Sequence, residues 1–266
     1  QWRPLLAMLI LFGLLFYSRD RKHWTKRLLY AWIVGLVLMG VLMRGGILGL
    51  ESVESTRWGG LPLTLLLSVF GLTAAYPLGV LLALGRQSKL RGIKVLCVVY
   101  IEAIRGVPLI SLLFMGSIIF PLFLPEGVTI NKILRAQVAI ILFTAAYIAE
   151  VVRGGLQGMA RGQYEAAESL GLNYYLTMRL VILPQALKIV IPPTVSILIS
   201  AFKDTSLVVI IALWDLLKTT KSVLSNPEWM GFSREAYIFV AILYFLGCFS
   251  MSQYSRRLER ELDREG

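Results

Sequence analysis

Residues 162–171 read Gly-Gln-Tyr-Glu-Ala-Ala-Glu-Ser-Leu-Gly, a short polar stretch that stands between two long apolar runs. The residues between its two glycines are mostly good helix formers. Gly171 stands where a glycine would cap the carboxyl end of a helix, and Gly162 stands at the opposite end. We therefore predict a two-turn helix with a glycine at each end. Its small face, Ala166 and Ala167, would let a partner approach closely.

Apolar runs dominate the rest of the sequence. Of the 266 residues, 57% are hydrophobic and 16% are charged, whereas about 25% are charged in an average soluble domain. A helix needs about 20 apolar residues to cross a bilayer. The runs that approach or exceed this length are 4–18, 28–43, 59–85, 95–125, 136–149, 189–214 and 236–255. The pattern predicts an all-α, polytopic membrane protein, and it excludes intrinsic disorder.

The basic residues indicate how the chain is oriented. The net charge of +11 would fit a nucleic-acid partner, but 17 of the 27 Lys and Arg residues lie in four connecting or terminal segments. These segments are 18–27, 85–94, 153–188 and 255–266. Positive charge favours the cytoplasmic side, so we expect the chain to start outside and to end in the cytoplasm. The two ends lie on opposite sides of the membrane only if the run 95–125 crosses once. It could cross at a tilt, or part of it could lie along the inner interface near residues 102–108.

The sequence also limits the chemistry of the chain. Its two cysteines lie in apolar stretches and do not suggest a disulfide framework. The single histidine, His23, leaves no His/Cys constellation that could bind a metal. No G-x-x-x-x-G-K-[ST] phosphate loop is present, so the chain is not expected to hydrolyse ATP alone. We predict no metal and no cofactor in this chain, and no enzymatic activity of its own.

Four stretches together resemble a known family of membrane proteins. The polar loop and the residues after it resemble the "EAA…G…I-x-L-P" loop of bacterial ATP-binding-cassette importer permeases, with Val181 in the place of Ile. The matching residues are Glu165, Ala166, Ala167, Gly171, Leu183 and Pro184. Residues 100–109, 146–155 and 203–207 are similar to permeases of polar or general amino acid importers. The two spans before residue 59 look like the long-chain subfamily of general L-amino-acid permeases.

The resemblance implies a fold and a mechanism. The fold would be the type I ABC importer transmembrane fold, a five-helix core plus at least two additional N-terminal helices. Residues 1–58 would hold those helices and a periplasmic connector, and 59–266 would form the permease core with a cytoplasmic coupling loop at 153–188. The helix ending at Gly171 would dock in a cleft of a separate ATPase. Closure of two ATPases would then move two permease subunits between inward-facing and outward-facing states.

The resemblance also implies partners and a location. The partners would be a second permease subunit, expected to be a non-identical homologue, and two copies of a cytoplasmic ATP-binding subunit that binds ATP and Mg. A periplasmic or extracellular amino-acid-binding protein would deliver the amino acid substrate. The chain would lie in the bacterial inner membrane among lipids, with no nucleic acid. The sequence does not identify the amino acid. Because it begins with Gln, we expect a longer natural chain.

Charged residues within apolar runs are costly in a bilayer and are candidates for function. Lys203 and Asp204 interrupt the run 189–214, and Asp215 ends it. On a continuous helix Asp204 and Asp215 would face the same way, about 16 Å apart along the axis. A zwitterionic substrate needs an anion for its ammonium group and a cation or N–H groups for its carboxylate. The candidate substrate path is therefore Lys203, Asp204, Thr205, Ser206, Asp215 and Glu150.

Each of these charges also has a structural interpretation. Lys203 and Asp204 could be satisfied by a partner subunit. Glu150 could contact substrate or form a gate, or it could pair with Arg153 or with the region of Glu102 and Arg105. Because Glu102 and Arg105 are three residues apart, they share a helix face, and we predict a structural ion pair near the cytoplasmic gate.

Two other functions stay open at the sequence level. A structural partner permease would couple to the ATPase but hold no substrate site. An ion-driven secondary transporter would have inverted repeats and helices broken at the midplane, and it would not need the polar loop, which argues against it.

Overall fold

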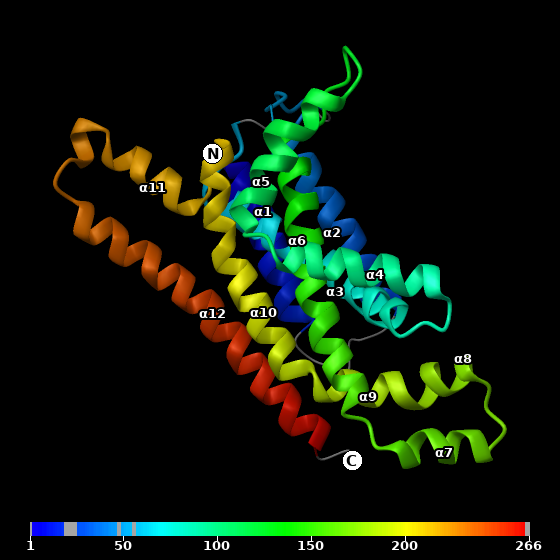
Figure 1. The fold of residues 1–266 in the computed structure, drawn as a ribbon. Coiled ribbons are helices and arrows are strands. Elements are labelled where there is room, and N and C mark those ends of the chain that lie inside the picture. The colour runs from blue at the N-terminus through cyan, green and yellow to red at the C-terminus, as the bar shows by residue number, and fades with distance from the viewer. Residues whose placement is uncertain (1, 19–25, 47–48, 55–56, 264–266) are drawn as a thin grey trace.

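The computed structural model describes residues 2–18, 26–46, 49–54 and 57–263. These residues are almost entirely helical, and among them the only strand-like pairing is one isolated bridge between Gly59 and Trp214. The N-terminus and C-terminus lie at opposite ends of the molecule (Figure 1). The loop that contains residues 162–171 projects from the same end as the C-terminus.

Each apolar run of the sequence contains helix. The α-helices are α1 (Trp2–Tyr17), α2 (Lys26–Arg44), α3 (Gly60–Arg86), α4 (Arg91–Arg105), α5 (Leu109–Phe114), α6 (Lys132–Gln157), α7 (Arg161–Ser169), α8 (Tyr174–Leu176), α9 (Leu183–Ile189), α10 (Ile191–Asp204), α11 (Leu216–Leu224) and α12 (Ser233–Asp263). Met115–Ile119 and Thr177–Ile182 are π-helical, whereas Phe120–Phe123, Thr205–Ile211 and Pro227–Trp229 are 3-10 segments.

The number of membrane spans is partly different from the sequence prediction. By length and composition, four helices in the described part of the chain can cross a bilayer, and the bent pair α4–α5 makes a fifth span if it is counted as one. The apolar parts of α1 and α2 are shorter, at 10–17 residues. The prediction of an all-α membrane protein is confirmed. Of the seven apolar runs, four contain a single helix that can cross, and 95–125 can cross only as a bent pair.

The core of the protein is the contact between α3 and α6, which run side by side in the same direction. Small residues make this approach possible: a Cβ atom added at Gly79 would lie 2.7 Å from Cβ of Ile148. Nearer the start of both helices, a Cβ at Gly71 would lie 3.0 Å from the amide nitrogen of Gln137. Packing this tight leaves no room for larger side chains, so α3 and α6 form a fixed unit.

The run 95–125 does not cross as one straight helix. α4 and α5 meet at an angle of 104°, and the break falls at Gly106, Val107 and Pro108. Proline disfavours helical geometry in the residue before it, and Pro108 is extended and caps α5. Of the two alternatives that the sequence left open, the bend favours the one in which the first part of the run lies along the interface.

The helices α1 and α2 form a hairpin that packs on the side of α3. Ala7, Leu11, Met39 and Met43 are its buried residues, and Trp58, Leu65 and Val69 pack against them. The predicted division of the chain at residue 58 therefore separates two units that share a hydrophobic cluster. That division stays a prediction.

Candidate functional site

The loop after α6 has a defined geometry at Gly171. Gly171 has φ +74°, its N–H donates to Glu168 O at 2.8 Å, and Leu172 N–H donates to Ala167 O at 3.1 Å. This pair of hydrogen bonds is the Schellman arrangement that ends a helix. The backbone there favours glycine because a Cβ is strained at positive φ. Gly171 ends α7, as its position in the sequence predicts.

The start of α7 differs from the prediction of a glycine at both ends. The N-cap residue is Ala160, with no side-chain cap, and the helix begins at Arg161. Gly162 therefore lies inside the first turn, where a Cβ would meet open space. The first turn has N–H groups without helical partners in any case, so a glycine there costs little and does not mark the boundary.

One face of α7 is held against the protein, and the other is free. Ala167 is buried, and the Gln185 amide on α9 donates to Gln163 Oε1 at 3.0 Å. Tyr164 packs on the cluster around α6 and α9, and burial, followed by the nearby Tyr174, raises the pKa of its hydroxyl. Glu165, Ala166 and Leu170 are exposed, Leu170 by 79%.

The residues after the loop lead back to α6. Leu183 begins α9 and is half-buried, and Pro184 is in the first turn, where its missing N–H costs nothing. A Cβ at Gly155 of α6 would lie 3.0 Å from the Ala186 carbonyl oxygen of α9. The free face of α7 is thus connected through α9 to the end of α6.

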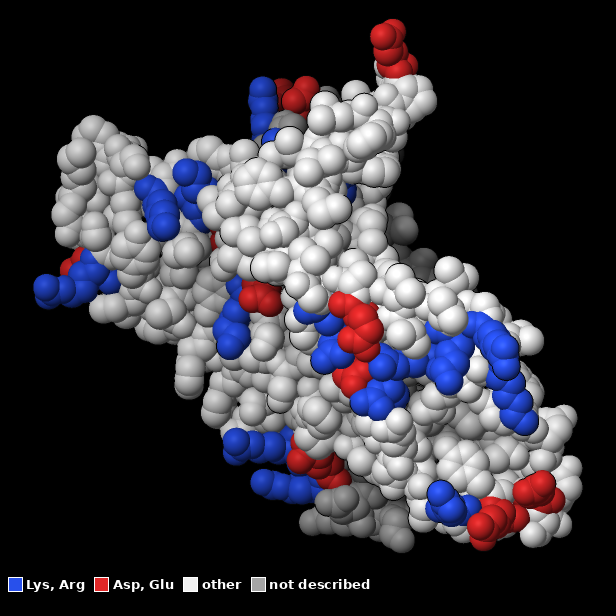
Figure 2. Space-filling model, viewed as in Figure 1, with Lys and Arg blue, Asp and Glu red and all other residues white. Residues whose placement is uncertain are grey.

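Five charged side chains form a cluster where α3, α4 and α6 meet near this loop. Glu150 Oε2 lies 3.3 Å from Arg86 Nη1 and 3.6 Å from Arg105 Nη1, and Glu150 Oε1 accepts from Arg153. Glu102 Oε1 lies 2.9 Å from Arg86 Nη1, and Glu102 Oε2 lies 4.0 Å from Arg105 Nη1. Mixed acidic and basic side chains gather in this region (Figure 2).

The cluster contains the contacts that the sequence suggested and one residue, Arg86, that it did not. Glu102 contacts Arg105, and Glu150 contacts both Arg153 and Arg105. Arg86 was missed because it follows the apolar run 59–85 and looks like one of several basic residues in a polar turn. Its position as the last residue of α3 directs it to both glutamates.

The chain is not helical throughout from Asp204 to Asp215. α10 ends at Asp204, a 3-10 segment follows, and Ala212 has φ +57°. The two aspartates would face the same way only on a continuous α-helix. Because the helix changes to a 3-10 segment at Thr205, the rise and rotation per residue change there, and this condition is not met. Thr205 is buried and donates to Phe202 O at 2.7 Å, whereas Ser206 is half-buried.

Asp215 and Asp204 have different surroundings. Asp215 is fully buried and caps α11, accepting from Leu217 N and Lys218 N at 3.0 Å. Burial raises the pKa of its carboxyl, and these hydrogen bonds oppose that effect. Asp204 is half-buried beside the exposed Lys203. Across the described ranges its carboxylate has no hydrogen bond or ion pair, so of the two aspartates it is the one available to a ligand.

A tyrosine of α12 lies beside the 3-10 segment that follows Asp204. The Tyr244 hydroxyl of α12 is buried near Asp215, Thr205 and Thr64, and Thr64 accepts from Leu216 N at 3.0 Å. Sequence reasoning missed Tyr244, although a tyrosine inside the apolar run 236–255 could have marked it.

The structure offers no metal site within the residues it describes, since no group of three His, Cys, Asp or Glu side chains lies together there. His23 lies outside the described residues.

Comparison with known proteins gives a consistent family signal. Residues 75–264 match the family model described as "Binding-protein-dependent transport system inner membrane component". The chain is 49% identical over 269 residues to YhdY, an inner membrane amino-acid ABC transporter permease protein of Escherichia coli (strain K12), covering 99% of this chain and 72% of that one. It is 52% identical over 219 residues to BztC, a glutamate/glutamine/aspartate/asparagine transport system permease protein of Rhodobacter capsulatus. That match covers 82% of this chain and half of BztC.

Solved structures agree with the fold. A crystal structure of an amino acid ABC transporter with histidines has a chain that is 33% identical and superposes with a TM-score of 0.67. The match covers 76% of this chain and 92% of the other. An inward-facing structure of the MetNI methionine ABC transporter, with 20% identity and a TM-score of 0.57, has a similar fold.

The charged cluster predicts unequal roles for its two glutamates. Glu150→Gln should lower the free energy of unfolding by about 1.5–3 kcal/mol, the range for a charged hydrogen bond, because Glu150 contacts three arginines and is 23% exposed. Glu102→Gln, at a side chain that is 54% exposed, should cost about 1 kcal/mol or less. Denaturant titration in mixed micelles measures both. Equal losses would show that Glu150 is not the centre of the cluster.

Proposed function

The chain belongs to the binding-protein-dependent transport system inner membrane component family, and we propose that it forms half of the membrane path of an ATP-driven amino acid importer. Its role is transport rather than catalysis. The observation that carries the proposal is the loop at α7, a short helix fixed on one face, ended by Gly171 and free on the other face.

The free face of α7 is where we propose that a separate ATP-binding subunit docks. Glu165, Ala166 and Leu170 offer a small and partly apolar surface to a cleft. The contacts of Gln163 with Gln185 and of Gly155 with Ala186 would carry a movement of α7 into α6. Two ATP-binding subunits, which bind ATP and Mg, would close on ATP and open the path to the outside.

The remaining partners and the orientation follow from this arrangement. With α7 in the cytoplasm, the C-terminus is cytoplasmic and α1 begins outside, in agreement with the distribution of basic residues. We propose a second permease subunit, a non-identical homologue, and a periplasmic or extracellular amino-acid-binding protein. The names of YhdY, BztC and the crystallised transporter favour amino acids as the substrate class.

The substrate contact that we propose is the helix break at Asp204. Its carboxylate is free of protein partners in the described residues and would bind the ammonium group of an amino acid. Lys203 would bind the carboxylate, with help from Ser206. Asp215 and Glu150 hold structural positions, as a helix cap and in the charged cluster. If the partner subunit alone binds substrate, this chain is a structural permease.

Gly171 provides a test of coupling. Gly171→Ala should strain the left-handed turn by about 1–2 kcal/mol and reduce both co-purification with the ATP-binding subunit and ATPase activity stimulated by the binding protein. Gly171→Asn should retain more activity, since Asn tolerates this conformation. Gly92→Ala, likewise in open space in the first turn of a helix but on α4, is the matched control and should not reduce either measurement. Full coupling in Gly171→Ala would contradict the proposal.

Lys203 and Asp204 provide a test of substrate contact. Asp204→Asn and Lys203→Met should each lower amino acid uptake into proteoliposomes by roughly tenfold or more, the loss expected for one charged hydrogen bond. ATPase activity without substrate should persist, because neither residue contacts α7. Ser196→Ala, elsewhere on α10, serves as the control. Unchanged uptake and substrate range in both charge variants would favour the structural-permease alternative.

A further inference from the structure

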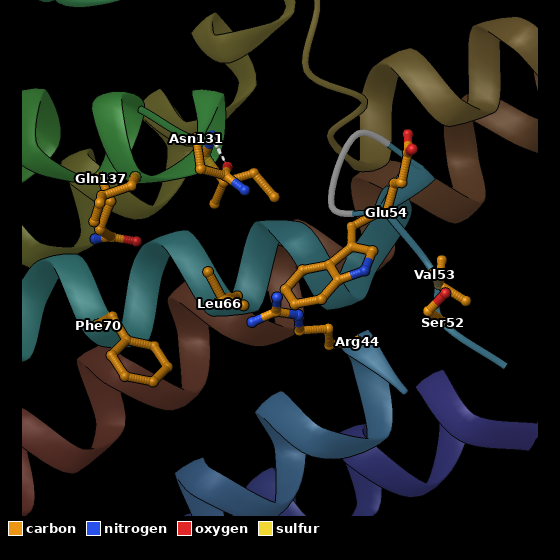
Figure 3. A pocket seen from close by; sticks show the side chains of 11 residues that line it. Arg44, Ser52, Val53, Glu54, Leu66, Phe70, Asn131 and Gln137 are labelled. Atoms are coloured by element: carbon orange, nitrogen blue, oxygen red, sulfur yellow. Dashed lines mark hydrogen bonds between the residues drawn. The ribbon is translucent and has the colours of Figure 1, made fainter. Parts of the chain in front are cut away.

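A cavity of about 730 Å³ lies at the end of the molecule opposite α7, between the α1–α2 hairpin and the core. Four segments line it: the end of α2, the connector before α3, α3 itself and the start of α6. Figure 3 shows Arg44 reaching from α2 toward Leu66, with Gln137 and Asn131 coming from the α6 side and Phe70 beyond them.

The depth of this cavity matches one leaflet of a bilayer. Its polar end is at Arg44, the last residue of α2, and near Trp58, two residues before α3 begins. Phe70 is ten residues into α3, about 15 Å from the start of that helix. Half of the hydrocarbon core is also about 15 Å. The cavity therefore extends from the level of lipid headgroups toward the middle of the membrane.

Two buried polar atoms of residues that line the cavity have no hydrogen-bond partner in the described part of the protein. Gln137 is 8% exposed; its amide nitrogen donates to Leu67 O at 3.2 Å, but its Oε1 is buried without a hydrogen bond. The indole N–H of Trp58 is also buried without one. Arg44 is exposed and forms no ion pair with any other described residue, so its guanidinium is available to an anion. Buried polar groups are rarely left unpaired, so the Trp58 N–H indicates a missing acceptor at the polar end of the cavity.

The apolar part of the cavity indicates what kind of ligand this is. Leu66, Phe70 and Leu134 line it, and Leu134 is 54% exposed, so the wall is open to hydrocarbon. An amino acid or a polar peptide segment would leave these side chains uncovered. A ligand with one polar end and a long apolar end, aligned with the membrane normal, would satisfy both parts.

We propose that this cavity binds one glycerophospholipid of the leaflet on the side away from α7. Arg44 would bind the phosphate, and the Trp58 N–H would donate to an ester carbonyl. One acyl chain would lie along Leu66, Phe70 and Leu134. The lipid would thereby join the hairpin to the core, and it would be a component of the interface rather than of the surrounding bilayer.

Native mass spectrometry of the purified importer complex tests the proposal with defined lipids. Wild-type complex should retain one phosphatidylglycerol or phosphatidylethanolamine per copy of this chain after mild delipidation, and it should not retain diacylglycerol. The Arg44→Gln complex should retain at least roughly tenfold less phospholipid than the wild type, as expected for the loss of one charged hydrogen bond. Arg57→Gln is the matched control, an exposed arginine of the connector between α2 and α3 that does not line the cavity. Equal retention by the two variants, or equal retention of diacylglycerol, would overturn the proposal.

A cross-linking measurement tests the same proposal without the Arg44→Gln variant, so its result does not depend on how stable that variant is. A photoreactive amino acid at Leu134, in an otherwise unchanged complex, should form an adduct with phospholipid, and Leu66→Trp in the same chain should suppress it by filling the cavity. An adduct with another protein subunit, or a lipid adduct unaffected by Leu66→Trp, would show that the cavity has a different occupant.

Discussion

The close packing of α6 against α3 is the contact on which the rest of the structure depends. Gly79 and Gly71 allow α6 to approach within van der Waals distance, and the interface buries Ala75, Ala145 and Ile148. Helices in a bilayer associate through such small-residue packing, because lipid offers no hydrophobic drive toward association. Because this pair is fixed, its two ends are fixed as well. The end near α7 carries the charged cluster, and the opposite end carries the lipid cavity.

We expect movement in this molecule at the breaks in its helices, and not within the closely packed α3–α6 pair. α4 meets α5 at 104°, and α10 changes to a 3-10 segment at Thr205. Between these breaks, α7 is connected to α6 by side-chain and backbone contacts through α9. A force on the free face of α7 would therefore move the α3–α6 unit as a body, and the helix break at Asp204 would change its surroundings.

Much of the fold could be predicted from the sequence because apolar runs and glycine caps are local signals. The run 59–85 became α3, and Gly171 ended its helix with positive φ. Other features depend on contacts that a single sequence does not reveal. The contacts of Arg86 depend on α4 and α6, and the change to a 3-10 segment after Asp204 has no local signal that the sequence analysis used. Gly162 looked like a capping residue, because sequence alone does not distinguish a glycine in the first turn of a helix from a glycine that caps it.

The central claim is that the free face of α7 is the docking surface of an ATP-binding subunit. Its most direct test places a photoreactive amino acid at Leu170, the exposed residue beside Gly171, in an importer that retains amino acid uptake. We expect a cross-link to the ATP-binding subunit, with a yield that changes when ATP is added. An active importer in which position 170 cross-links to lipid, or to no subunit at all, would contradict the account.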